Sequence, residues 1–406
     1  MKKILLLLTR CPYPITGGRE SILAQTIDFL DGHYDLYILY FSKNESDKRE
    51  FKKRNLNSYE LKFPSKIELI YNIFFRRHLS LQENLFYSKS NLELIDKTIE
   101  EIQPNLVYVD MIRMSQYIEN YDVYKVIDID DLLSIRYQRF IKQKENSIFG
   151  TFSSVIPSFI KKLVEKILKN TILEYESKKI ENREVEVVKK YDRCFLVSEK
   201  EKNHLIKKTN SHNIYTNTQA IKPRENLYKK NLKCNNLLFI GNMLTAQNKS
   251  SLKMIVDEIL PKFRFNYKLF IVGSYDSAIE ELTYANSNIE LLGFVDNLEE
   301  TLGNIKLALM PISFGTGIKT KVLDCMSYGI PVVTNAVGSE GLNTKDYRDI
   351  YILKNNEITN ESMLRILNDN KLLQSIGENG YQYIKDYHNF VTLRESFLNH
   401  IDVKVD

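Results

Sequence analysis

The sequence has few cysteines and histidines, and neither residue type is clustered. Its four cysteines are far apart and form no close pair, and its six histidines are equally scattered. This spacing disfavours a disulfide framework and a zinc ribbon, predicts no metal cluster, and fits a reducing compartment. The cysteines are Cys11, Cys194, Cys234 and Cys325.

The chain also carries little net charge. Its formal charge is +5 over 406 residues, so it is not a polyelectrolyte binder of nucleic acid, and we expect no nucleic-acid partner. Apolar residues make up 43% and charged residues 27%, which excludes wholesale disorder and fibrous repeats. The length predicts two or three domains.

Long apolar runs are missing as well. The start, MKKILLLLTRCPYP, resembles a short secretion signal, but its apolar run covers only residues 4–8. A signal core needs about 7–15 apolar residues and a spanning helix about 20. A short apolar run followed by turn residues instead predicts a buried parallel strand. We expect a soluble, cytoplasmic protein and leave open its peripheral attachment to the inner face of the cell membrane.

What the chain does have is a regular alternation of strand-like runs and amphipathic segments, which predicts parallel sheets wrapped by helices. We predict an α/β fold of two Rossmann-like, doubly wound domains that face a cleft. The first covers residues 1–216, a polar linker covers 217–236, and the second covers 237–385. The predicted strands are 4–8, 36–41, 106–109, 126–129 and 194–197, then 237–240, 268–272, 289–292, 307–310, 331–334 and 350–353.

Two loops that follow predicted strands contain paired glycines. In TRCPYPITGGRE, Gly17 and Gly18 allow close approach of the backbone to a ligand, and the next helix start offers N–H groups to an anion. The loop is not GxGxxG and lacks the acidic residue of a dinucleotide site, so a nicotinamide site is disfavoured. The alternative interpretation is a plain tight turn.

The second loop, SFGTGIKTKVLDCMSYGI, has Lys319 and Lys321 in the first turn of a predicted helix, where the helix dipole repels cations. An anion such as a diphosphate between them would explain this placement. Otherwise both lysines are solvated, or Lys321 pairs with Asp324. Asp324, in an apolar stretch, is either a ligand for both hydroxyls of a ribose or a surface carboxylate.

Two further segments have more than one interpretation. Asp128, Asp130 and Asp131 follow a predicted strand and either bind a divalent cation, act as a base or cap the next helix. Residues 149–170 form a basic amphipathic pattern, which indicates either a helix on an anionic membrane surface or a helix packed on its own domain.

Taken together, these residues resemble the GT-B-fold glycosyltransferases, specifically the retaining sugar transferases of family 4. The N-terminal segments CPYPITGG, IDIDDLLSIRY and YDRCFLVSEKEKNHL are similar to that family. The C-terminal half carries the strongest part of the resemblance, in the family's order and spacing. Its segments are LLFIGNMLTAQNKSSLKMIVDEILP, IELLGFVDNLEETL and ALMPISFGTGIKTKVLDCMSYGIPVVTNAVGSEGL.

The resemblance implies a role for each matching position. The first domain would bind the acceptor, the second would bind the nucleotide-sugar, and a C-terminal helix at about 386–406 would return to the first domain. The implied catalytic residues are Lys319, Lys321 and Thr316. The implied donor-binding residues are Gly17, Gly18, Gly241, Asn242, Phe294, Val295, Gly315, Gly317, Ile318 and Asp324. The implied acceptor residues are Arg19, Asp110, Asp130 and Asp131.

Within the donor set, Phe294 and Val295 would flank the base, Asp324 would hold the ribose, and the backbone of 315–318 would face the sugar and phosphate. Two departures stand out. Thr316 replaces the family's first glutamate, and GNMLTAQN lacks the basic pair often found after the first C-terminal strand. We expect Lys319 and Lys321 to supply the missing charge in a variant site.

We therefore predict a retaining glycosyltransferase of bacterial-type surface polysaccharide or glycoprotein glycan synthesis. It would use a nucleotide-diphosphate sugar and a glycan or lipid-linked glycan acceptor, with no cofactor and no metal ion. Two alternatives stay open: a catalytically weak GT-B subunit that partners another transferase, and a GT-B nucleotide-sugar epimerase.

Overall fold

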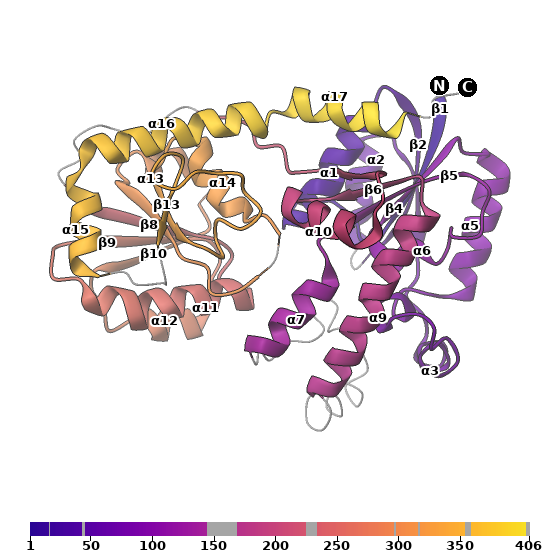
Figure 1. Ribbon diagram of the computed structural model, residues 1–406, viewed down its shortest axis with the longest axis horizontal. Coiled ribbons are helices and arrows are strands. Elements are labelled where there is room, and N and C mark those ends of the chain that lie inside the picture. The colour runs from indigo at the N-terminus through magenta and orange to yellow at the C-terminus, as the bar shows by residue number, and fades with distance from the viewer. Residues whose placement is uncertain are drawn as a thin grey trace. The chain divides into compact units, whose positions relative to one another are not determined.

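The computed structural model describes residues 1–15, 17–42, 45–143, 169–224, 234–295, 298–315, 317–353 and 359–402. The chain divides into two compact units (Figure 1). The N-terminal unit comprises Met1–Gln219 and Arg394–Asp406, and the C-terminal unit comprises Ala220–Leu393. Each unit contains one sheet in which all strand pairs are parallel, so the predicted α/β class with two doubly wound sheets is confirmed.

The sheet of the N-terminal unit has seven strands in the order β3-β2-β1-β4-β5-β6-β7. The chain leaves β1 toward β3 and then returns to place β4 on the other side of β1, so the strand order reverses there. In such sheets the loops at the carboxyl ends of the strands around this reversal form the ligand site. The strands are β1 (Lys2–Leu8), β2 (Tyr34–Phe41), β3 (Asn57–Leu61), β4 (Leu106–Asp110), β5 (Tyr124–Asp130), β6 (Arg193–Leu196) and β7 (Ile214–Thr216).

The apolar run at the start of the chain forms β1, and each side chain from Ile4 to Leu8 is fully buried. A strand covered by helices on both faces needs apolar residues at successive positions rather than in alternation. The predicted buried strand is therefore confirmed. The edge strands β3 and β7 were missed, because β3 alternates exposed and half-buried residues and β7 has only three residues.

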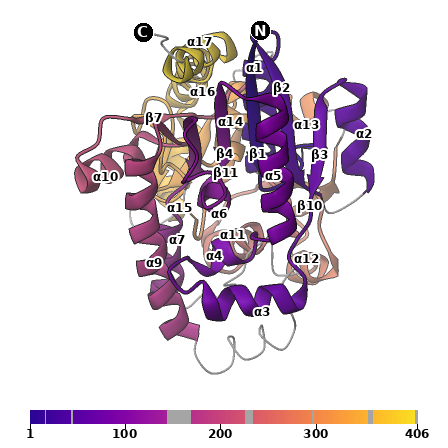
Figure 2. The ribbon, with the colours of Figure 1, turned by 90° about the vertical axis from the view of Figure 1, so that its right-hand side faces the viewer.

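Helices of the N-terminal unit are α1 (Gly18–Leu30), α2 (Glu45–Lys53), α3 (Lys66–Phe75), α4 (Leu81–Asn84), α5 (Lys89–Ile102), α6 (Met111–Ser115), α7 (Leu133–Gln143), α9 (Lys169–Lys190) and α10 (Glu199–Thr209). Figure 2 shows α3 beside α4 at one end of this unit, apart from the sheet. Most of the predicted basic amphipathic segment, residues 149–168, lies outside the described residues. No helix in the described ranges is long and apolar enough to cross a membrane.

The last helix, α17 (Phe390–Ile401), begins in the C-terminal unit and ends in the N-terminal unit. Its buried Phe397 contacts the rings of Phe29 and Phe195, with centroids 5.6 and 5.0 Å away. Arg394 also donates from Nε to the carbonyl of Phe29 at 3.0 Å. The end of α17 is thus fixed to the N-terminal unit by aromatic contacts and by a hydrogen bond from a side chain to a backbone carbonyl, as the resemblance implied.

The sheet of the C-terminal unit has six strands in the order β10-β9-β8-β11-β12-β13, so its order reverses between β8 and β11. Figure 1 shows α11 and α12 on one face and α13, α14 and α16 on the other. The strands are β8 (Asn236–Ile240), β9 (Lys268–Val272), β10 (Ile289–Gly293), β11 (Leu307–Met310), β12 (Val332–Asn335) and β13 (Tyr351–Leu353). The helices are α11 (Ala246–Met254), which a π-turn (Ile255–Ile259) continues, α12 (Ser277–Thr283), α13 (Leu298–Leu302), α14 (Thr320–Ser327), α15 (Asn360–Asn368) and α16 (Asn370–Tyr387).

A close approach of two glycines fixes the carboxyl edge of this sheet. Gly273, directly after β9, has φ of +129°, and a Cβ there would overlap the carbonyl oxygen of Gly241, directly after β8. The amide of Gly241 also donates to the carbonyl of Val272 at 2.9 Å. Only glycine at position 273 lets the two loops lie this close together.

We expect Gly273→Ala to lower the free energy of unfolding by at least about 2 kcal/mol, because it adds a steric overlap to an unfavourable φ. Gly32→Ala is the matched control, since Gly32 has φ of +77° and nothing within 4 Å of an added Cβ. It should cost about 1 kcal/mol. Urea unfolding of both variants measures the difference, and equal losses would contradict the overlap.

Candidate functional site

The loop after β11, residues 311–319, is held in place by polar side chains of other elements. The amide of Ser313 donates to Oγ of Ser251 in α11 at 3.1 Å, and Gln247 of the same helix donates from Nε2 to the carbonyl of Phe314 at 2.6 Å. Asn335, at the end of β12, accepts from the amide of Ile312 at 3.2 Å. Residues 312–314 of this loop therefore present their backbone in a fixed conformation.

Two glycines in this loop have backbone angles that other residues rarely adopt. Gly315 has φ of +139° and Gly317 has φ of +65°. Between them, Thr316 lies outside the described residues, so its predicted catalytic role stays a prediction. Ile318 and Lys319 follow and lead into α14.

The start of α14 carries cations where a helix usually carries acidic residues. Its N-cap residue, Lys319, makes no side-chain capping hydrogen bond, and no acidic residue lies in the first turn. Lys319 is buried, and its ammonium donates to the carbonyl of Gly317 at 2.6 Å. Uncapped N–H groups and a buried ammonium leave this helix start with a strong preference for an anion.

Lys321 brings a second cation to the loop after β8. Its ammonium donates to Oδ1 of Asn248 in α11, and Nδ2 of Asn248 donates to the carbonyl of Asn242 at 2.8 Å. Burial, together with the charge of Lys319, lowers the pKa of Lys321 to about 8. Within the described ranges Lys321 forms no ion pair, so the alternative pairing with Asp324 is not observed.

Asp324 lies one turn further along α14. Burial raises its pKa to about 6, against an opposing effect of Arg224. Its carboxylate accepts no hydrogen bond from the described part of the chain. It is thus a half-buried acceptor that a hydroxyl ligand would satisfy.

Four of the other implied donor residues lie at the same edge of the C-terminal sheet. Gly241 and Asn242 follow β8, and Phe294 and Val295 follow β10. The side chain of Phe294 is 76% exposed, as an aromatic platform for a base would be. All of these lie at the carboxyl ends of parallel strands, together with Lys319 and Lys321.

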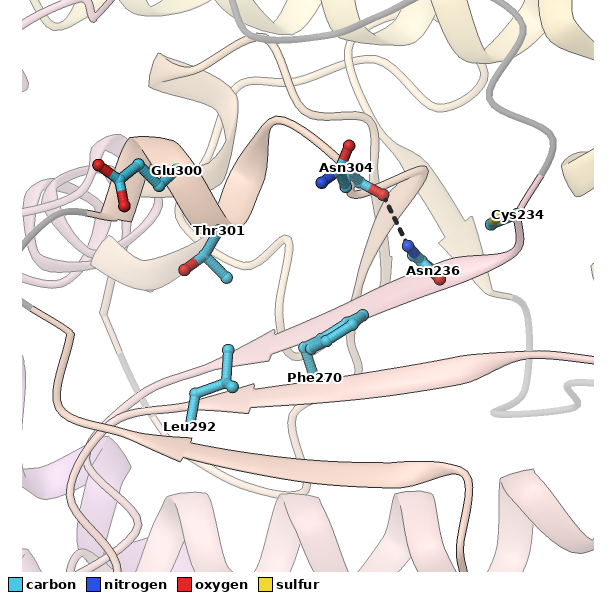
Figure 3. Close-up of a pocket in the computed structure, with 7 residues that line it drawn as sticks. All are labelled: Cys234, Asn236, Phe270, Leu292, Glu300, Thr301 and Asn304. Atoms are coloured by element: carbon cyan, nitrogen blue, oxygen red, sulfur yellow. Dashed lines mark hydrogen bonds between the residues drawn. The ribbon is translucent and has the colours of Figure 1, made fainter.

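A separate pocket of about 480 Å³ lies between the sheet and α13 (Figure 3). Figure 3 shows Phe270 and Leu292 pointing from the strands toward the helix that carries Glu300 and Thr301. No lysine or arginine lines it, so it does not suit a diphosphate. The pocket and the predicted donor residues are therefore different places in this unit. Its lining residues are Cys234, Asn236, Phe270, Leu292, Glu300, Thr301 and Asn304.

In the N-terminal unit, the four implied acceptor residues divide into a buried core and an accessible carboxylate. Arg19, the second residue of α1, donates from Nε to Asp110 at 2.9 Å and from Nη1 to Asp128 at 3.1 Å and to Asp130 at 3.3 Å. Its Nη2 donates to Asp110 and to the carbonyl of Asp128. Arg19 thereby joins the start of α1 to the ends of β4 and β5.

Asp110 is completely buried and also accepts hydrogen bonds from the amide and hydroxyl of Thr9. Burial alone would raise the pKa of Asp110, but Arg19 and Thr9 outweigh it and hold that pKa below its ordinary value. Asp130 is the accessible member, with its side chain 17% exposed. Burial raises its pKa to about 6 even though Arg19 opposes this, and Asp131 adds to the rise.

The alternatives for the aspartate cluster can be compared with its contacts. Arg19 lies among Asp110, Asp128 and Asp130, and Asp131 pairs with Arg136, so guanidinium groups neutralise this cluster. In the described ranges no group of three or more acidic, histidine or cysteine side chains is arranged for a metal ion. Glutamates that are distant in the sequence accept hydrogen bonds from the backbone amides at the start of α7. Glu201 accepts from the amide of Leu132, and Glu184 accepts from the amide of Ser134.

Gly17 and Gly18 are exposed at the start of α1. Gly17 is the N-cap residue and provides no side-chain cap, and nearby Arg10 and Glu20 form an ion pair at 2.9 Å. Sequence reasoning did not single out Asn248, Gln247, Ser251 or Asn335. Asn335 could have been noticed in the sequence, because it is a polar residue at the end of the apolar strand PVVTN. The other three residues lie on α11, and their contacts with the loop after β11 and with Lys321 join residues that are far apart in the sequence.

Comparison with known proteins agrees with this architecture. Residues 234–369 match the family model of glycosyl transferases, group 1. TarM of S. aureus aligns over 99% of both chains with a TM-score of 0.66 and 13% identity. HepE of Anabaena aligns over 98% of both chains with a TM-score of 0.64 and 12% identity.

The chain has the GT-B fold. A sucrose-phosphate synthase of Thermosynechococcus elongatus shares this GT-B fold over 98% of both chains, with a TM-score of 0.66 and 11% identity. In sequence, an uncharacterized 44.6 kDa protein in the cps region of Klebsiella pneumoniae is 24% identical and covers 95% of this chain and 96% of its own length. The expected resemblance to GT-B glycosyltransferases is confirmed.

In the N-terminal unit of this GT-B fold, we expect Arg19→Lys to lower the free energy of unfolding by about 3 kcal/mol. An ammonium group cannot replace the planar guanidinium group that bonds three carboxylates. Asp130→Asn is the control: it removes a carboxylate whose charge is already disfavoured and should change stability by about 1 kcal/mol or less. Urea unfolding at pH 7 tests both. A loss for Asp130→Asn as large as that for Arg19→Lys would contradict the division into core and accessible residues.

Proposed function

We propose that this chain is a retaining glycosyltransferase of bacterial-type surface polysaccharide or glycoprotein glycan synthesis. Its donor would be a nucleotide-diphosphate sugar and its acceptor a glycan or lipid-linked glycan. The family match over residues 234–369 supports glycosyl transfer, and the cps-region relative supports a role in a surface glycan. HepE has been crystallised with UDP and with UDP-glucose, which supports a nucleotide-sugar as donor.

The single observation that carries the proposal is the convergence of two cations on an uncapped helix start. Lys321 reaches Asn248 beyond β8, and Lys319 lies over the loop that follows β11. A diphosphate there would meet two ammonium groups and the N–H groups of the first turn of α14. Because Lys321 bonds Asn248, which in turn bonds Asn242 in the loop after β8, it places a cation near the segment that lacks the family's basic pair.

The reaction we propose breaks the bond between C1 of the sugar and the diphosphate oxygen. The acceptor hydroxyl forms the new bond to C1 on the same face, and its proton passes to the departing diphosphate. The protein then needs no pair of carboxylates; it orients both substrates and stabilises the charge that develops on the leaving phosphate. Lys319, Lys321 and the start of α14 would perform the electrostatic part.

The remaining residues would position the substrates. We propose that Asp324 accepts hydrogen bonds from the ribose and that Phe294 and Val295 flank the base. Gly241 and Asn242 would present their backbone to the nucleotide. On the acceptor side, Asp130 would contact the sugar, and Arg19, which Asp110 fixes, would hold the carboxylate of Asp130 in place.

The first experiment is a thermal-shift measurement with UDP, GDP, CDP, ADP and dTDP, followed by sugar conjugates of the nucleotide that binds. We expect one diphosphate to raise the melting temperature selectively. Incubation of the matching nucleotide-sugar without acceptor then tests for epimerisation. No shift with any nucleotide would reject the donor site and favour the partner-subunit alternative.

We expect the affinity for that diphosphate to fall up to about tenfold between pH 7 and pH 9, because Lys321 loses its proton above a pKa of about 8 while bound anion favours the protonated form. The terminal phosphate of the diphosphate, with a pKa of about 6, is already mostly ionised at pH 7 and gains charge only slightly up to pH 9. Calorimetry at several pH values measures the effect. Lys321→Arg, which stays charged, should bind with no such pH dependence, and Lys321→Met should bind weakly at every pH. An unchanged pH profile in Lys321→Arg would contradict the assignment.

We expect Lys319→Ala to lower turnover by about 100-fold or more with the fold intact, because it removes a cation from the leaving group. Lys253→Ala, which removes an exposed lysine of α11, is the control and should keep full turnover.

We also expect EDTA to leave the rate unchanged, because the lysines neutralise the diphosphate without a metal ion. A loss of threefold or less in Lys319→Ala, or inhibition by EDTA that magnesium restores, would reject these roles.

A further inference from the structure

Helix α3, KIELIYNIFF, exposes a continuous apolar stripe on the N-terminal unit. Its members occur at spacings of three, four, seven and eight residues from the first, which places them on one face of a helix. Their side chains are between 38% and 82% exposed. They are Ile67, Ile70, Tyr71, Phe74 and Phe75, and we call them the α3 stripe.

The opposite face of α3 fixes its orientation. Leu69 is buried, and the buried Asn72 donates from Nδ2 to the carbonyl of Tyr87 at 2.9 Å. At the helix start, Ser65 caps the amide of Glu68 at 3.2 Å, and Glu68 accepts from the amide of Lys89 at 2.8 Å. The α3 stripe is therefore held outward by specific contacts on the inner face.

This concentration of apolar side chains is unusual for a water-exposed helix. Five of the sixteen exposed large hydrophobic residues among those described lie on these ten positions. The rings of Tyr71 and Phe75 stack with centroids 4.7 Å apart. Contiguous exposed apolar surface of this kind marks an interaction site.

The charges around the stripe identify the kind of partner. Residues 62–79 contain four cationic side chains and one carboxylate, that of Glu68. Lys66 begins the helix and the exposed Arg77 follows its end, so cations flank the stripe on both sides. The ammonium of Lys179 in α9 also bonds the carbonyl of Arg77 and the hydroxyl of the exposed Tyr175. Aromatic and aliphatic residues flanked by cations suit an anionic lipid surface.

We infer that the α3 stripe docks the N-terminal unit on an anionic membrane, with α3 parallel to the surface. Phe74 and Phe75 would enter the boundary between headgroups and acyl chains, and Lys66 and Arg77 would contact lipid phosphates. The residues of the α3 stripe are different from residues 149–170, whose basic pattern gave the expectation of membrane contact. The inference does not depend on the proposed glycosyl transfer, because its readout is lipid binding.

Co-sedimentation of the full chain with vesicles tests the inference. The vesicles are phosphatidylcholine alone, or a mixture with phosphatidylglycerol, at low and at high salt. We expect binding to the anionic vesicles that salt weakens. Phe74→Ser/Phe75→Ser should bind at least tenfold more weakly and Arg77→Gln several-fold more weakly. Tyr284→Ser and Lys262→Gln, at exposed positions of the C-terminal unit, are the matched controls and should bind as the parent does.

The sequence contains no tryptophan, so one substitution provides a local probe. The emission of Phe75→Trp should shift to shorter wavelength with anionic vesicles and be quenched by brominated lipid, whereas Tyr284→Trp should do neither. Equal binding by the double serine variant, no binding at low salt, or no response of Phe75→Trp would overturn the inference. So would a dimer in solution that the double serine variant dissolves, because a second copy would then cover the stripe.

Discussion

The pairing of β8 with β11 determines where the C-terminal unit can bind a ligand. Leu237 pairs with Leu307 and Leu238 with Ala308, although 70 positions separate the two residues of each pair in the sequence. The loops that follow them therefore leave the sheet at the same edge and then diverge. Lys321 and Asn248 come together because of this pairing, although 73 residues separate them.

The same edge carries groups that are unfavourable for folding on their own. The pKa of Lys321 falls from 10.5 to about 8, which corresponds to at most about 3 kcal/mol of disfavoured charge. In the opposite sense, the raised pKa of Asp324 shows that burial also disfavours its carboxylate. At the edge of the other sheet, Met111 and Asp130 adopt positive φ of 63° and 70°. Such costs concentrate where a protein binds ligands, because a stable core would replace these groups by apolar ones.

Local patterns allowed much of the fold to be predicted from the sequence. A strand buried on both faces appears as a run of apolar residues, as in Ile4–Leu8, and needs no knowledge of its neighbours. The lysines at the start of α14 were also visible locally, because they contradict the ordinary charge preference of a helix start. Edge strands such as β3 gave no comparable signal, since half of their residues face solvent.

Contacts over long sequence distances could not be predicted in the same way. The aspartates at the end of β5 suggested a metal ion, a base or a helix cap, but Arg19 lies 109 residues from Asp128 and no pattern in the sequence links the two. The N–H groups at the start of α7 donate hydrogen bonds to Glu184 and Glu201, which lie in two other helices. For α3, apolar residues on every side concealed which of them would be exposed. Tertiary contacts of the inner face, such as those of Leu69 and Asn72, decide this.

A missing motif and an unusual helix start have one physical explanation in the proposed donor site. The stabilisation of a diphosphate depends on the distance to a positive charge and on the local dielectric, and is independent of the strand from which that charge comes. An ammonium on α14 that reaches Asn248 provides this charge near the loop after β8, where the sequence has none before Lys249. The loop after β8 lacks a basic pair, and the start of α14 carries two lysines that its dipole would otherwise repel. The second feature would then compensate electrostatically for the first. In the proposed donor site, the two lysines would thus supply the charge that the missing basic pair does not.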